Sequence, residues 1–509
     1  MSKSGIGWTA MLAIAAMGSA QAVNLDINGR GQVLLYPYYT VNKGQQTLLS
    51  VTNTATVAQA AKVRFREGYN GRTVLDFNIF LSPFDSWSAT VFALSDAGIR
   101  SDGAAILSRD TSCTAPLFSE DGTSINGTPY VALREFDYLQ PSDGGPSTID
   151  RTREGMIEII AMSNVGAPLA AAITHGSNRS PPTGCAQVRT LLGSEPALSS
   201  APSGGLMGSF SVVNGADGTY LSARAEALAG FTGRPLFTST ASTLPDLSIV
   251  NDGAGVVLGN RATARIIDPA GKALTLTYPG PDTRSRRVDA VSAVLMADRI
   301  YNEYEMSASS GAASDWVVTM PTKAFHVDPL NIGGGVPAIP PFTRVYNGSP
   351  SATPRFSWVG FSRSVYSREG VMSSPGFGCG FFCPPGFMPT IFARSVNVVP
   401  IRDTVVTESS VLGSRLVSSI ARSLNEGTWK DTGTMRFNLD PPQEPHSLLA
   451  SAEGKVLRGL PVIGFWASNR VNNIANSTAA ETTFAPYAAA VRHATSATCV
   501  KASDGTPCD

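Results

Sequence analysis

The sequence predicts an all-β protein made of two β-sandwich, immunoglobulin-like domains with long loops and few short helices. Three observations lead to this prediction: apolar and polar residues alternate along much of the chain, Gly (49) and Pro (34) are frequent, and only 15% of residues are charged. A period of two places side chains on alternate faces of a strand, and closely spaced turns are typical of sandwiches. A chain of 509 residues is also too long for one core.

Residues 1–22 are predicted to be a signal peptide. Lys3 precedes an apolar run, and Ala20-Gln21-Ala22 matches an A-x-A cleavage site. The run is too short for an ordinary membrane span, and no later stretch approaches the ~20 apolar residues that a span needs. We therefore expect an exported protein without a membrane span, located in the periplasm, at the cell surface or outside the cell.

Residues 23–240 are predicted to form the N-terminal sandwich. In the segment 47–68, Val63 and Phe65 alternate with three basic residues, Lys62, Arg64 and Arg66. The segment 73–94 alternates in the same way, breaks at Ser82-Pro83 and resumes. Residues 101–200 are less regular, with one convincing strand at 155–165, and we expect them to form long loops clamped by a disulfide.

Residues 241–509 are predicted to form the C-terminal sandwich. Strand patterns recur at 314–325, 356–367, 390–401, 434–442 and 459–471. The segment 288–306 is the best candidate for a helix, because it lacks Gly and Pro and has apolar residues at helical spacing. These residues are Ala293, Met296, Ala297, Ile300 and Tyr304.

An even number of cysteines in an exported chain favours disulfides. Proximity in the sequence pairs Cys379 with Cys383, Cys499 with Cys508, and Cys113 with Cys185. The last pair would close a long loop, worth about 4 kcal/mol in the chain-entropy model. Zinc at Cys379 and Cys383 would need further ligands, and the histidines are scattered singly, so we interpret this pair as a structural staple.

The stapled segment 375–389, PGFGCGFFCPPGFMP, is unusually apolar for a turn. Its glycines and prolines make it unlike a regular element that could bury its own side chains. We expect it either to fold over a sandwich face or to contact a partner. The candidate partner contacts are Phe377, Phe381, Phe382 and Phe387.

Charge and motif patterns favour no nucleic-acid partner and no cofactor. Acidic and basic residues balance at 39 each, and no long run of one sign occurs. The sequence lacks G-x-S-x-G, the P-loop, G-x-G-x-x-G after a strand, H-E-x-x-H and C-x-x-C-H. His326, near Asp328, is the histidine in the most suggestive setting, and we interpret it as a strand-end histidine at a turn.

Five stretches of the chain together resemble a family of exported proteobacterial proteins labelled hypothetical or cell-surface proteins. The resemblance spans most of residues 30–475 and includes LLYPYYTVNKGQQTLLSVTNTA, AKVRFREGYNGRTVLDFNIFLSPFDSW, TLPDLS, IYNEYEMSASSGAASDWVVTMPTKAF and GLPVIGFWASNRVNN. It implies export and a β-rich build, and it supplies no catalytic residues.

Two functional hypotheses follow. The first is a non-enzymatic cell-surface or periplasmic protein that acts in adhesion, ligand binding or surface assembly, with possible self-association and an unknown surface ligand or protein partner. The alternative is a secreted hydrolase acting on polysaccharide through paired carboxylates. Candidate acids for such a pair, in or beside predicted strands, are Glu67, Asp76, Glu158, Glu303 and Glu305.

Overall fold

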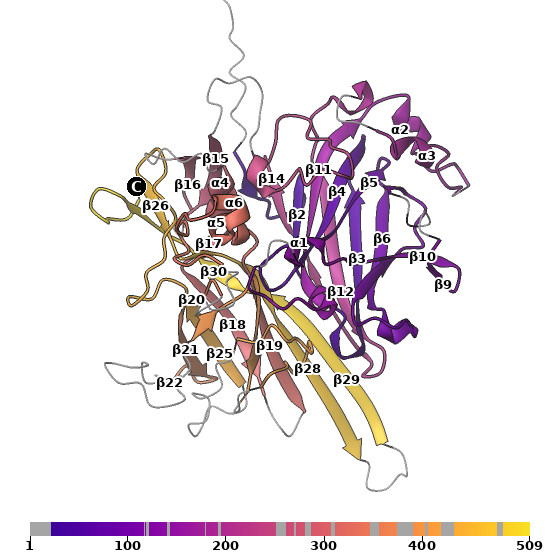
Figure 1. Cartoon of the computed structure of the whole chain (residues 1–509). Helices are drawn as coiled ribbons and strands as arrows, with labels where there is room; N and C mark the ends of the chain where they lie inside the picture. The colour runs from indigo at the N-terminus through magenta and orange to yellow at the C-terminus, as the bar shows by residue number, and fades with distance from the viewer. Residues whose placement is uncertain are drawn as a thin grey trace, which may run out of the picture.

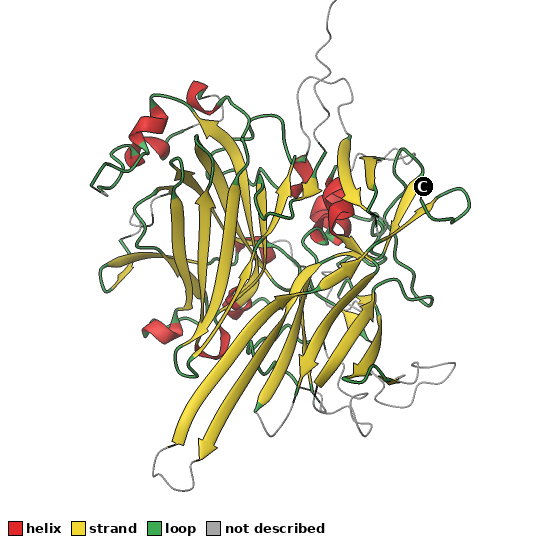
Figure 2. Cartoon of the chain, turned by 180° about the vertical axis from the view of Figure 1, so that it is seen from behind, coloured by secondary structure: helices red, strands yellow, loops and turns green. Residues whose placement is uncertain are grey.

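The protein is built mainly from antiparallel β-sheets. The computed structural model describes residues 22–116, 118, 122–139, 143–178, 180–191, 195–250, 261–268, 271–279, 287–306, 311–346, 356–373, 390–402, 406–418, 432–475 and 482–508. Strands account for 45% and helices for 11% of the structure, which confirms the prediction of a mainly β protein with few helices (Figure 2). Among the described residues, no helix is long and apolar enough to cross a membrane.

The first half of the described chain contains two seven-stranded sheets. The first sheet has the order β1 (Asn24–Leu25), β14 (Glu226–Ala229), β2 (Val33–Thr40), β11 (Glu154–Val165), β4 (Ala58–Glu67), β5 (Thr73–Leu81) and β8 (Cys113–Ala115). The second has the order β13 (Thr219–Arg224), β12 (Leu206–Asn214), β3 (Gln45–Asn53), β6 (Ser86–Ala93), β7 (Ala104–Leu107), β10 (Thr128–Ala132) and β9 (Ser124–Ile125). The strand predicted at 155–165 therefore lies in the middle of the first sheet. The predicted loop region also contributes β8 to the edge of the first sheet and β7, β9 and β10 to the second.

The second half of the described chain contributes a four-stranded and a five-stranded sheet. The former has the order β24 (Val396–Ile401), β19 (Ala312–Thr319), β28 (Ile463–Ala475) and β29 (Thr482–Arg492). The latter has the order β22 (Met372–Ser373), β21 (Ser362–Ser367), β25 (Thr432–Asn438), β18 (Arg299–Glu305) and β30 (Ala494–Ser496). Strands β28 and β29 form a ribbon that extends past the ends of their neighbours (Figures 1 and 2).

Smaller elements complete the described fold. Two-stranded pairs are β15 (Ala262–Ile267) with β16 (Ala273–Tyr278), β17 (Met296–Ala297) with β27 (Leu460–Pro461), β20 (Val359–Gly360) with β23 (Ile391–Phe392), and β26 (Lys455–Arg458) with β31 (Thr498–Lys501). The α-helices are α1 (Phe136–Leu139), α2 (Leu169–Ala172), α3 (Cys185–Val188), α4 (Val288–Leu295), α5 (Ala324–Val327) and α6 (Pro329–Ile332).

The two large sheets differ in how their faces are covered. Strand β3 of the second sheet alternates between buried and more exposed residues, whereas every residue of β2 and β4 in the first sheet is buried. One face of the first sheet packs in a core with the second sheet, through residues such as Phe77 and Trp87. Its other face packs at β2 against α4 and the β15–β16 pair, through residues such as Leu35 and Val291.

The basic residues of β4 lie under a covering segment and not in solvent. Lys62 Nζ donates to the backbone carbonyls of Ser239 and Ser242 at 3.3 and 3.0 Å. Arg64 donates to the carbonyls of Thr243 and Pro245. Because a buried polar group is costly unless it is hydrogen-bonded, these side chains hold the segment that leads from the first half toward the second.

A buried cluster of charges organises the turn between β4 and β5. The Glu67 carboxylate accepts hydrogen bonds from three backbone N–H groups of this turn, those of Tyr69, Asn70 and Arg72, at 2.7, 3.0 and 2.9 Å. It also receives two bonds from the Arg151 guanidinium, at 2.8 and 3.0 Å. Arg151 bonds in addition to Asp143, and all three side chains are at most 1% exposed.

The same turn joins the two halves of the chain. Arg72 pairs with Asp328 of the second half at 3.0 and 3.2 Å. The Tyr346 hydroxyl donates to the carbonyl of Asn70 at 2.8 Å, and the backbone of Ser395 and Val396 donates to the turn. We call the side chains of Glu67, Arg72, Asp143, Arg151 and Asp328 the ionic clamp.

The neighbouring Glu154 makes a second tie between the halves. Its buried carboxylate accepts from the Tyr38 hydroxyl at 2.8 Å, the Ser414 hydroxyl at 2.5 Å and the Arg415 N–H at 2.8 Å. Burial raises the pKa of Glu154 by more than these hydrogen bonds lower it, so the pKa lies above its ordinary value. The hydrophobic core between the two large sheets likewise contains second-half residues, namely Val317, Val396, Val398, Val411, Leu412, Leu416, Phe465 and Ala467. The domain division at 240/241 stays a prediction.

The helix predicted over 288–306 is correct only in its first part. Helix α4 ends at Leu295, and Arg299–Glu305 forms strand β18. In β18, Ile300 and Tyr304 are buried while Tyr301 and Glu303 are exposed, so an alternating pattern was hidden within the helical spacing. Antiparallel pairing with β25 on one side and β30 on the other stabilises the strand against the helical alternative.

Two of the three predicted disulfides lie in the described residues and are confirmed. Cys113 pairs with Cys185, which attaches α3 to β8, and Cys499 pairs with Cys508. Cys379 and Cys383 lie outside the described residues, as do Phe377, Phe381, Phe382 and Phe387.

Peptide mapping without reduction should recover the two described pairs and, as the third, Cys379 with Cys383. A free thiol at Cys379 or Cys383 would contradict the third pairing.

Breaking the ionic clamp should strongly destabilise the protein. The change Arg151→Met leaves Glu67 and Asp143 buried without their main cation, a defect that typically costs about 3–5 kcal/mol. Urea unfolding of the variant measures the loss of free energy of unfolding. The control is Arg415→Met, which breaks the exposed pair with Asp150 and should cost at most about 1 kcal/mol. Equal, small losses in both variants would contradict the role of the clamp.

Candidate functional site

All four histidines lie in the described residues, and each has structural hydrogen-bond partners. His175 contacts the Thr111 hydroxyl at 3.0 Å. His446 lies between the carbonyls of Pro341 and Gly360, at 3.2 and 3.1 Å. These contacts tie each imidazole to a neighbouring loop and explain both residues without invoking catalysis.

His326 lies on helix α5 and not at a strand end, so its predicted setting is wrong. Its Nδ1 contacts the carbonyl of Pro340 at 2.9 Å, and its Nε2 contacts the Ser292 hydroxyl at 3.1 Å. Asp289 approaches the same Nε2 at 3.7 Å. A serine–histidine–aspartate triad needs the carboxylate on the other nitrogen, and here all three side chains are buried. This cluster is a structural network between α4 and α5.

The five carboxylates considered for a hydrolase are spread over separate ion pairs. Glu67 belongs to the ionic clamp, and the others pair with arginines or face solvent. Asp76 pairs with Arg64, Glu158 with Arg66 and Glu305 with Arg470, whereas Glu303 is exposed. A glycosidase needs two carboxyl groups facing one substrate bond. Asp76 and Glu158 flank Arg64 on one face of the first sheet, but the Glu158 side chain is fully buried, so this pair cannot face a substrate bond.

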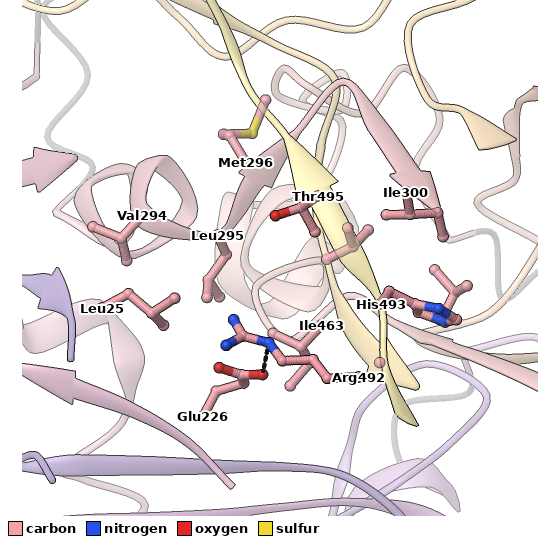
Figure 3. A pocket seen from close by; sticks show the side chains of 13 residues that line it. Leu25, Glu226, Val294, Leu295, Met296, Ile300, Ile463, Arg492, His493 and Thr495 are labelled. Atoms are coloured by element: carbon pink, nitrogen blue, oxygen red, sulfur yellow. Dashed lines mark ion pairs between the residues drawn. The ribbon is translucent and has the colours of Figure 1, made fainter. Parts of the chain in front are cut away.

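A pocket lies where the two halves of the chain meet, and we call it the junction pocket. Its cavity measures about 50 Å³. The first half contributes Leu25 and Glu226, and the second half contributes residues of α4, β17, β18, β19, β28 and the β29–β30 crossing. Most of the residues that line the pocket are apolar. Figure 3 shows Glu226 and Arg492 between the apolar side chains of Leu25, Leu295 and Ile463.

The polar side of the junction pocket is an ion pair between the halves. Arg492 Nε lies 2.6 Å from Glu226 Oε1. The Glu226 side chain is only 10% exposed, whereas that of Arg492 is 58% exposed. Burial raises the pKa of Glu226, and the charge of Arg492 opposes that rise. The carboxylate is therefore held in place by the sheet, while its cation reaches it from the solvent side.

The position of Arg492 follows from a change of sheet along the chain. Strand β29 belongs to the four-stranded sheet and ends at Arg492, and β30 begins at Ala494 in the five-stranded sheet. His493 lies at the crossing, where its Nε2 donates to the carbonyl of Val317 at 2.9 Å and its Nδ1 accepts from Asn302 at 3.0 Å. This bonding selects the neutral tautomer with the proton on Nε2. Gly464 lets β28 lie close to β19 at this crossing, because a Cβ at Gly464 would lie 1.9 Å from the backbone oxygen of Val317.

The chemistry available in the junction pocket is binding and not nucleophilic attack. His493 has both nitrogens engaged, and the carboxylate of Glu226 faces a guanidinium. The sequence prediction missed this site, since its residues come from segments hundreds of positions apart. The sequence did contain a usable signal, namely a single charged residue next to an uncharged stretch. Arg492 follows ten uncharged residues, and Glu226 lies between Ala225 and the apolar residues ALAG at 227–230.

Comparison with known proteins adds no relative. The chain matches no family model, no curated protein and no solved structure. Within the described ranges, no cluster of three or more His, Cys, Asp or Glu side chains could hold a metal ion. The description of the site therefore depends on its geometry alone.

The buried His493 should make the protein less stable in mild acid. Burial lowers its pKa to about 4, against ~6.5 in an unfolded chain. Between these values the unfolded state takes up a proton that the folded state does not. Stability that is present above pH 6.5 is therefore lost as the pH falls toward 4, by up to roughly 3 kcal/mol.

Urea unfolding at several pH values tests this contribution. The variant His493→Gln keeps a donor and an acceptor but cannot titrate, so its stability should fall less between pH 6.5 and 4 than that of the wild type. As an internal control, the two profiles should run parallel above about pH 8, where His493 is neutral in both the folded and the unfolded protein. Profiles of wild type and His493→Gln that stay parallel in mild acid as well would show that His493 titrates normally in the folded protein.

Proposed function

We propose that this is an exported, non-enzymatic β-protein of the cell surface or periplasm that acts by binding, in adhesion, ligand capture or surface assembly. The proposal includes cleavage of residues 1–22 and two immunoglobulin-like sandwich domains, at 23–240 and 241–509. It also keeps the resemblance to exported proteobacterial surface proteins as an expectation.

One observation carries the proposal: the histidines and most of the candidate carboxylates are engaged in structural bonds. The four histidines bond to carbonyls, hydroxyls or an amide, and four of the five candidate carboxylates pair with arginines. The junction pocket adds a mainly apolar site with one ion pair, which suits recognition. Two disulfides fit an oxidising compartment.

Binding without turnover can be measured directly. Purified chain 23–509 should sediment with washed proteobacterial cells, and the supernatant should gain no new reducing sugar ends during prolonged incubation. Release of reducing ends that is lost on replacing a carboxylate would support the polysaccharide hydrolase instead. Failure to sediment with cells, together with no release of sugar, would contradict both surface binding and hydrolysis.

A further inference from the structure

The junction pocket combines two features that together define a ligand class. Most of its lining residues are aliphatic, with His493 and Thr495 among the polar ones, and its acidic group is a nearly buried carboxylate, Glu226. Leaving such a carboxylate without a cation is strongly unfavourable, because burial removes the water that would solvate it. Any ligand that enters beside Glu226 must therefore either leave Arg492 in place or replace its positive charge.

Arg492 is suited to being replaced. Its side chain is 58% exposed, and within the described part of the chain it forms an ion pair with Glu226 only. A guanidinium that is half in solvent loses little on leaving a single carboxylate, because water solvates it. Glu226, which is 10% exposed, cannot gain the same compensation. The pair is thus asymmetric, with a fixed anion and an exchangeable cation.

The size of the cavity limits the apolar part of the ligand. A cavity that holds one water needs roughly 10–15 Å³, and the cavity of about 50 Å³ exceeds this only a few-fold, so the apolar part of the ligand must be small. This corresponds to a short unbranched alkyl chain. The aliphatic side chains of Leu25, Leu295 and Ile463 surround the ion pair, so a chain extending from the carboxylate meets apolar surface (Figure 3).

We propose that the junction pocket binds a primary alkylammonium group, with the ammonium on Glu226 in place of Arg492 and a short alkyl chain in the cavity. Free alkylamines and the lysine side chain of a partner share this chemistry. The inference depends on the proposed function, since it takes the pocket to bind and not to react. Occupation would also release the end of β29 from β14, and thus connect the site to the β28–β29 ribbon.

Calorimetry with n-butylamine hydrochloride at neutral pH tests the site. Arg492 acts as a tethered competitor, so Arg492→Ala should bind the amine about tenfold or more tightly than the wild type. The matched control is Arg470→Ala on β28, whose pair with Glu305 has nearly the same exposures, 52% and 10%, and lies outside the pocket. This control should bind as the wild type does. Adding Glu226→Gln to Arg492→Ala should abolish the gain.

Two comparisons make the outcome decisive. Butanol and butyrate, which have the same chain length, should bind Arg492→Ala at least about tenfold more weakly than the amine, and equal binding of all three would overturn the ammonium assignment. In the wild type, n-butylamine should shift the NMR signal of the Arg492 Nε–H and leave that of Arg470 unmoved. An unmoved Arg492 signal at saturating amine would also overturn the proposal.

A lysine-containing peptide distinguishes the two sources of the ammonium group, a free alkylamine and the lysine side chain of a partner. Acetyl-Gly-Lys-Gly-amide competing with n-butylamine would indicate a lysine side chain of a partner, and failure to compete would indicate a free amine. Failure of every amine to bind would leave sedimentation with cells unchanged. The two proposals therefore fail independently.

Discussion

The buried ionic clamp at the β4–β5 turn is the interaction on which the rest of the structure depends. Glu67 fixes the turn by accepting its backbone N–H groups, and Arg151 and Asp143 neutralise one another around it. Burial acts to raise the pKa of Asp143, but hydrogen bonds from Arg151 hold it below its usual range. With the turn fixed, Arg72 reaches Asp328, and the second half of the chain is placed against the first.

This placement generates the junction pocket. Once the second half lies against the first sheet, α4 covers β2 and β14, and the end of β29 reaches Glu226. Neither half alone supplies the complete pocket, since its carboxylate comes from β14 and its cation from β29. A ligand bound between two packed halves contacts both of them, so its binding can affect both.

The sequence predicted the class of structure well, and the contacts between distant segments poorly. Alternation located strands such as β5 and β11, and cysteine spacing predicted the pairs 113–185 and 499–508. Alternation places Val63 and Phe65 on one face of β4 and the basic residues on the other, but it does not reveal that a later segment covers and buries Lys62 and Arg64. The pairs Arg72–Asp328 and Glu226–Arg492 join positions more than 250 residues apart, and no local pattern encodes such contacts.

Hydrogen exchange in increasing, sub-denaturing concentrations of urea tests most directly whether the clamp makes the two halves one cooperative unit. The most protected amides of β4 and β11, in the first half, should exchange with the same free energy and the same urea dependence as those of β19 and β28, in the second. Coincident exchange of all four strands is the result that this account predicts. Exchange of β19 and β28 at clearly lower urea, while β4 and β11 remain protected, would contradict it.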